Sequence, residues 1–146
     1  MSEQSHITTT ARILLVLGGA ATAAMASYHF FIPSAFGWAR ETVGLYPTIR
    51  WALFSINFFF SCLLLALGMT TIAGVVMRCV NEGTYLVVVV SGVLFWLVNA
   101  GYQLLIPMPL PSSYAVLGYF LKSYAFGVAA LLLIPLVQLI RKRKSV

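Results

Sequence analysis

Between Arg50 and Arg78 the chain reads WALFSINFFFSCLLLALGMTTIAGVVM (Trp51–Met77), a run of 27 residues without a charged side chain. As an α-helix with a rise of about 1.5 Å per residue, this run would be about 40 Å long, and the hydrocarbon layer of a bilayer is about 30 Å thick. We therefore interpret it as a tilted transmembrane helix. Asn57 follows Arg50 by seven residues, so both lie near one face of this helix, and other helices must supply partners for that face.

The composition of the whole chain is that of a membrane protein. Its 146 residues are 61% hydrophobic and 8% charged, whereas soluble domains carry about 25% charged residues. We expect a single transmembrane domain over residues 1–146. The net charge of +6 is no nucleic-acid signal, because four of the nine basic residues form the tail Arg141–Lys144 directly after a span, where they mark topology and can touch anionic lipid.

Four apolar runs predict an all-α, integral membrane four-helix bundle with up-down-up-down topology. The spans are expected at residues 13–32, 51–77, 85–106 and 114–140. Pro33 is expected to end the first helix, a short surface helix is expected at Ala39–Leu45, and Asn81–Gly83 is expected to form a turn. The prolines at 107, 109 and 111 predict an extended second loop.

The first apolar run has a competing interpretation as a cleaved signal peptide, because Ala24-Met25-Ala26 resembles a cleavage site. The apolar character continues beyond this site, which favours an uncleaved span. We expect Gly18, Gly19 and Gly68 to face neighbouring helices. On the premise that Leu15 faces lipid, replacing Gly19 with leucine should cost much more stability than replacing Leu15 with alanine.

Basic residues predict the orientation of the bundle. One side holds Arg12, Arg78 and the four basic tail residues, and the opposite side holds only Arg40, Arg50 and Lys122. The positive-inside rule then places both termini in the cytoplasm, with a bacterial inner membrane as the expected location.

With this topology, scattered polar residues fall at similar depth in the outer half of the bundle. They are His29, Arg50, Asn57, Asn99 and Gln103. One interpretation is a polar pocket that holds a headgroup, a quinone ring or another small molecule. The other is that the amides hold helices together, at roughly 0.6 kcal/mol per hydrogen bond.

Cysteine and histidine spacing indicates neither a metal nor a cofactor. Cys62 and Cys79 would lie roughly 25 Å apart along one helix, too far for a disulfide. The two histidines, His6 and His29, are expected at opposite ends of the bundle. The three carboxylates, Glu3, Glu41 and Glu82, are all expected in loops, which weakens proton-relay and hydrolytic mechanisms.

Two segments resemble a widespread, uncharacterised family of small bacterial four-span membrane proteins. The first runs from His29-Phe30-Phe31-Ile32-Pro33 through Phe36-Gly37-Trp38 to Arg50, and the second is Phe95–Gln103. In that family the patterns are H-x-F-x-P, F-D-W and F-W-x-x-R-x-x-x-Q. This sequence departs from them, with Gly37, Asn57 and Asn99 where Asp, His and Arg are usual. The resemblance implies the fold over the first three spans and no activity, and the ending of the first helix is also similar to DoxX-like membrane proteins.

Three classes of function remain open on these observations. The first is a non-enzymatic subunit of a membrane complex, or a binder of lipid or of a small apolar ligand, with the bilayer, a membrane protein or a second copy as partner. The second is a membrane enzyme acting on a quinone or lipid, with His29 as general acid/base and Arg50 as charge stabiliser. The third is an oligomeric transporter, for which four spans per chain are few.

Overall fold

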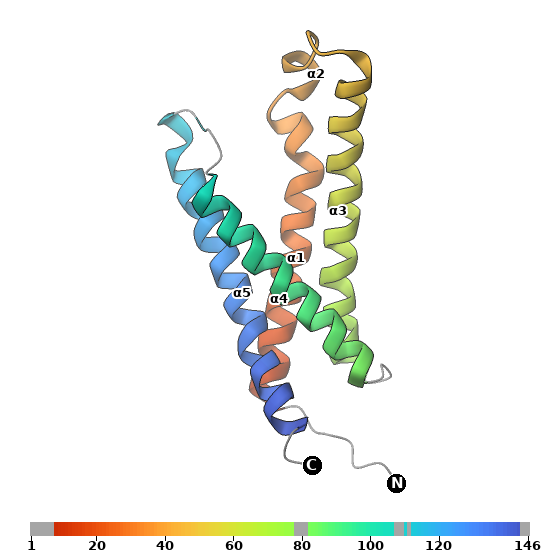
Figure 1. Cartoon of the computed structure of the whole chain (residues 1–146), viewed down its shortest axis with the longest axis vertical. Helices are drawn as coiled ribbons and strands as arrows, with labels where there is room; N and C mark the ends of the chain where they lie inside the picture. The colour runs from red at the N-terminus through yellow and green to blue at the C-terminus, as the bar shows by residue number, and fades with distance from the viewer. Residues whose placement is uncertain (1–7, 78–81, 107–109, 111, 144–146) are drawn as a thin grey trace.

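The computed structural model describes residues 8–77, 82–106, 110 and 112–143. Its elements are α1 (Thr9–Ala35), α2 (Trp38–Glu41), α3 (Pro47–Val76), α4 (Glu82–Leu105), a 3₁₀ turn (Ser112–Tyr114) and α5 (Ala115–Arg143) (Figure 1). The four long helices are each long and apolar enough to cross a membrane. The prediction of an all-α, four-helix membrane bundle is therefore confirmed.

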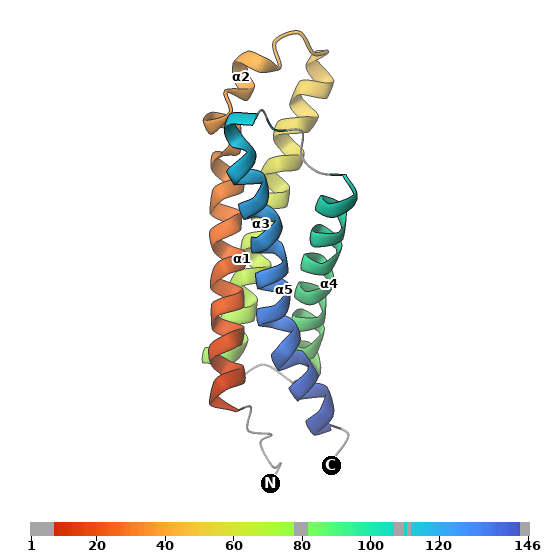
Figure 2. The same cartoon turned by 90° about the vertical axis from the view of Figure 1, so that its left-hand side faces the viewer.

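The four long helices form two hairpins that diverge at one end. Helices α1 and α3 pack side by side, and α5 packs against both α1 and α4 (Figures 1 and 2). Helix α4 lies near α3 only at one end and leans across the molecule toward α5 at the other (Figure 1). Following the predicted orientation, we call the end that carries α2 the outer end and the opposite end, where residues 8 and 143 lie, the inner end.

Helix α1 continues through Pro33, so the prediction that this proline ends the helix is wrong. A proline removes one helical hydrogen bond, and membrane helices tolerate that loss where neighbouring groups compensate for it. The chain leaves the helix at Gly37, whose φ of 60° lies in the left-handed region that favours glycine. At the other end of α1, the Thr8 hydroxyl oxygen accepts a hydrogen bond from the Ala11 N–H at 3.2 Å and caps the helix.

The surface helix is α2, which is shorter than predicted and begins one residue earlier. The Thr42 hydroxyl donates to the Trp38 carbonyl oxygen at 2.6 Å and closes the single turn. Glu41 is thus the last residue of the surface helix α2, between the first two candidate spans, and Glu82 is the first residue of α4, one residue before the candidate span that begins at Gly83. Asn81 of the predicted turn and all three prolines of the second loop lie outside the described residues.

Glycines allow the close packing of α1 against its neighbours, as predicted. A Cβ atom on Gly68 would lie 2.7 Å from the Gly19 carbonyl oxygen, and one on Gly18 would lie 2.6 Å from Leu132 Cδ2. Leu15, however, is completely buried, so the premise that it faces lipid is wrong. Leu15 lies three residues before Gly18 and therefore shares the helix face that points into the bundle.

The inner ends of the helices are joined by polar contacts. Arg12 Nη2 donates to the Val75 carbonyl oxygen in the last turn of α3 at 3.3 Å, where a cation suits the helix dipole. The Tyr85 hydroxyl of α4 donates to the Thr71 carbonyl oxygen of α3 at 3.3 Å. The Tyr85 ring occupies the space that a Cβ atom on Gly74 would need, so α3 and α4 approach closely here.

Candidate ligand-binding cleft

The deepest point of the candidate site is the contact between the Trp96 side chain of α4 and Thr22 of α1. The Trp96 indole Nε1 donates to the Thr22 hydroxyl oxygen at 3.0 Å, and the Thr22 hydroxyl donates to the Gly18 carbonyl oxygen at 2.8 Å. Trp96 and Thr22 are only 2% and 1% exposed. This buried contact forms a floor at mid-depth of the bundle, and on the outer side of it α4 leans away from α3 toward α5 (Figure 1).

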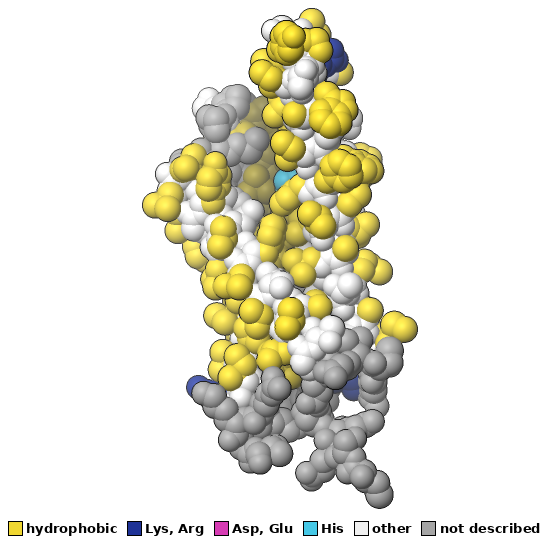
Figure 3. Space-filling model, turned by 45° about the vertical axis from the view of Figure 1, so that its right-hand side comes forward, with side chains coloured by type: hydrophobic (Ala, Val, Ile, Leu, Met, Phe, Trp, Pro, Cys, Tyr) yellow, Lys and Arg dark blue, Asp and Glu magenta, His cyan; other side chains and the backbone are white. Residues whose placement is uncertain are grey.

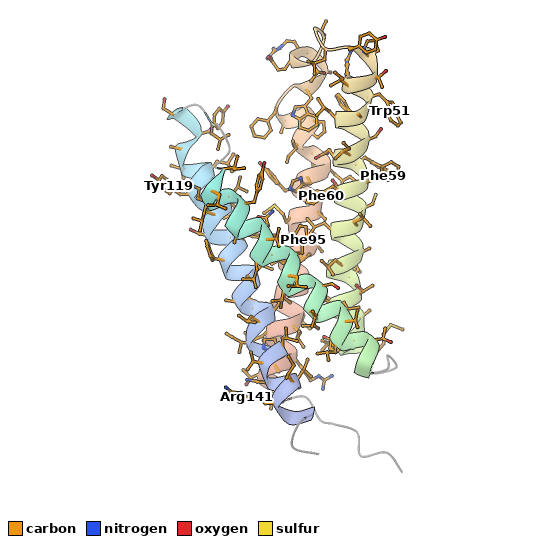
Figure 4. All side chains as sticks on the ribbon, in the orientation of Figure 1. Trp51, Phe59, Phe60, Phe95, Tyr119 and Arg141 are labelled. Atoms are coloured by element: carbon orange, nitrogen blue, oxygen red, sulfur yellow. The ribbon has the colours of Figure 1, made fainter. Side chains whose placement is uncertain are left out.

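Two phenylalanine rings mark where α3 and α4 separate. The ring centroids of Phe60 and Phe95 lie 5.8 Å apart, and this is the outermost ring contact or hydrogen bond between α3 and α4 among the described residues. Both rings lie between the helices, whereas Phe59 and Trp51 point away from the bundle (Figure 4). Farther out, the surface is hollowed between the two hairpins (Figure 3). His29 is the one histidine in the described part of the chain, and its imidazole is visible in this hollow.

One wall of this cleft is built by α1 and α3. Asn57 Nδ2 on α3 donates to the His29 carbonyl oxygen on α1 at 2.9 Å, and the Ser61 hydroxyl donates to the Asn57 carbonyl oxygen at 2.7 Å. The His29 imidazole meets the Phe60 ring at 4.8 Å between centroids, with the planes 67° apart. The Asn57 amide therefore joins two helices and holds His29 in place, while the imidazole stays half-buried at the edge of the hollow.

The facing wall belongs to α4 and carries two amides. Gln103 Nε2 donates to Asn99 Oδ1 at 2.6 Å. Asn99 follows Phe95 by four residues, and Gln103 follows Trp96 by seven, so both amides continue the helix face that carries the floor of the cleft. Both side chains are half-buried, and their one hydrogen bond lies within a single helix.

The basic side chains near the outer end are directed elsewhere. Arg50 Nη2 donates to the Ala39 carbonyl oxygen of α2 at 3.0 Å, which removes Arg50 from the predicted cluster. Glu41 pairs with Arg40 at 2.8 Å, and both side chains of that pair are exposed. Lys122 lies with its Nζ 6.0 Å from the centroid of the Tyr119 ring. Within the described part of the chain, the walls of the cleft therefore carry only uncharged or histidine side chains.

The structure thus divides the five predicted residues into three sets. His29 and Asn57 are in contact, Asn99 and Gln103 are in contact, and Arg50 binds α2. No hydrogen bond joins the two walls of the cleft within the described residues. Phe60 also contacts His29 and was not among the five predicted residues, although its position three residues after Asn57 places it on the same face of α3.

No group of three or more metal-ligating side chains occurs in the described part of the chain. Comparisons of the chain with protein-family models, curated proteins and solved structures find no match. The resemblance to the four-span family accordingly stays a prediction.

Proposed function

We propose that this four-span membrane protein is a non-enzymatic binder of a small lipid-soluble molecule, which it holds in the cleft between its two hairpins. The observation that carries the proposal is the state of the amides on α4. Asn99 and Gln103 bond to each other and to no other described helix, so they do not hold the bundle together in the way that Asn57 does.

Unused hydrogen-bonding atoms support the same proposal. The Asn99 Nδ2 and the Gln103 Oε1 have no partner among the described residues, although an Asn or Gln amide can donate two hydrogen bonds and accept two. Lipid chains offer no partner at that depth, and an unpaired amide in an apolar medium is costly. A bound molecule with polar atoms would supply the missing partners, while the rings of Phe60 and Phe95 would contact its apolar part.

The test is native mass spectrometry of the protein extracted with its surrounding lipids, together with its thermal unfolding. We expect the wild type to retain one apolar molecule per chain. Asn99→Leu should lose that molecule and keep its unfolding midpoint, because the amide contributes no bond between helices. The alternative, in which the amides hold helices together, requires the opposite pattern: no retained molecule, and an Asn99→Leu variant destabilised by roughly 1 kcal/mol or more.

A further inference from the structure

We infer that the ligand is electrically neutral and carries a flat ring with hydrogen-bonding atoms at opposite edges, as in a quinone-type ring on an apolar tail. This inference rests on the proposed function and specifies the chemical class of the molecule. Three features of the cleft lead to it: its charge, the arrangement of its polar groups and the shape of its apolar surface.

The charge of the cleft favours a neutral ligand. A phosphate headgroup held away from water needs a cation beside it, because an unpaired charge in an apolar site is strongly unfavourable. The three basic residues described near the outer end are engaged elsewhere: Arg50 on the Ala39 carbonyl oxygen, Arg40 on Glu41 and Lys122 beside the Tyr119 ring. An anionic phospholipid would therefore enter the cleft without a counter-charge.

The polar groups lie on two facing walls. His29 lies on the wall made by α1 and α3, and the Asn99–Gln103 amide pair lies on the wall made by α4. A molecule with a single polar end would satisfy one wall and leave the other unpaired. A six-membered ring with oxygen atoms at opposite edges presents an acceptor to both walls, and each wall contains N–H groups that can donate to it.

The apolar surface between the walls suits a flat ring. Phe60, Phe95 and Trp96 form a continuous series, with centroids 5.8 Å apart for the first pair and 5.3 Å apart for the second. Aromatic rings pack favourably in offset or edge-to-face arrangements, which a ring lying against the outer side of the Phe60–Phe95 pair can adopt. The tail can leave the cleft between α3 and α4, where Phe59 is 62% and Tyr102 is 60% exposed to the lipid side.

Quenching of tryptophan fluorescence by decylubiquinone, a neutral quinone with a short tail, tests the inference. The protein is prepared with Trp38→Phe and Trp51→Phe, so that Trp96 at the floor of the cleft is the reporter. We expect saturable quenching with one site per chain. Gln103→Leu should weaken binding roughly five- to tenfold, the effect of losing about one hydrogen bond. Gln138→Leu is the matched control: Gln138 is exposed at the inner end of α5, bonded to Thr8, and the change should leave binding unaltered.

Competition separates this inference from the proposed function. Phosphatidylglycerol with short chains should fail to displace decylubiquinone. If it displaces the quinone, or is itself the molecule retained in native mass spectrometry, the inference of a neutral ring is overturned and the proposed binding function stands. If quenching rises linearly without saturation and is equal in Gln103→Leu, the inference fails. If, in addition, the extracted protein retains no apolar molecule, the proposed function fails as well.

Discussion

At the scale of single residues, three polar side chains from three different helices donate hydrogen bonds to α1. The Trp96 indole reaches the Thr22 hydroxyl, the Asn57 amide reaches the His29 carbonyl oxygen, and the Tyr124 hydroxyl donates to the Ala21 carbonyl oxygen at 2.6 Å. These bonds come from α4, α3 and α5 in turn. Lipid offers these groups no alternative partner, so each bond specifies where its helix lies against α1.

Thr22→Val tests the bond at the floor of the cleft. Valine has nearly the same shape as threonine but leaves the buried Trp96 N–H without an acceptor, so we expect a loss of stability of about 1 kcal/mol. The measurement is the unfolding midpoint in mixed micelles titrated with a denaturing detergent. Thr70→Val is the control: Thr70 is exposed, and its hydroxyl bonds only to the Ala66 and Leu67 carbonyl oxygens of its own helix. Equal losses in both variants would contradict the assigned role of Thr22.

At the scale of helices, the spacing between neighbours varies with the residue at the contact. Helices α1 and α3 meet at Gly19 and Gly68, where backbone lies against backbone. Helices α3 and α4 meet closely at the inner end, where Gly74 gives room to the Tyr85 ring, and are held apart at mid-depth by two phenylalanine rings. Gly74 lets α3 and α4 approach closely at the inner end, and the rings of Phe60 and Phe95 hold them apart at mid-depth. The two helices therefore diverge toward the outer end and leave the cleft between them.

Gly68→Ala tests the close contact between α1 and α3. The added methyl group would lie 2.7 Å from the Ala23 nitrogen and from the Gly19 carbonyl oxygen, and backbone atoms cannot move aside without separating the helices. We expect a loss of about 1–3 kcal/mol in the same unfolding assay. Gly127→Ala on α5 is the matched control, since nothing lies within 4 Å of its Cβ position. That change should be neutral or stabilising by about 0.5–1 kcal/mol, because alanine is the better helix former. A Gly68→Ala variant as stable as Gly127→Ala would refute the packing described for α1 and α3.

At the scale of the whole molecule, the described ends of α1 and α5 lie together at the inner end, opposite α2 (Figure 2). The positive-inside rule predicts that this inner end is cytoplasmic. Reporter fusions after Val146 and in the segment between α4 and the 3₁₀ turn should therefore report opposite compartments, with the first in the cytoplasm. Fusions that report the same compartment would contradict the four-span topology, and opposite compartments with the first outside would contradict only the orientation.

The bundle could be predicted from the sequence because long uncharged runs in lipid have few alternatives to helices. The depth of His29, Asn57 and Asn99 followed from counting residues along each helix. The tilt of α4 could not be predicted in this way, because it depends on which side chains meet, such as Tyr85 with Gly74 and Phe60 with Phe95. Without that tilt, five polar residues at one depth looked like a single cluster, although Asn57 joins two helices, Arg50 binds α2 and the α4 amides bond to each other.

The two hairpins differ in their reach at the outer end. Helix α3 has 30 residues, about 45 Å of helix, whereas α4 has 24, about 36 Å, and it is tilted, which shortens its span further (Figure 1). The bilayer around this protein therefore contacts a longer helix at α3 than at α4. Matching its thickness to each helix costs a fraction of a kcal/mol per ångström of mismatch. The outer end of α4, where the shorter helix ends, is also the mouth of the cleft. A change in bilayer thickness would alter lipid packing at the point where a membrane-dissolved molecule would leave the leaflet, so the affinity of this protein for such a molecule should depend on the thickness of the membrane that surrounds it.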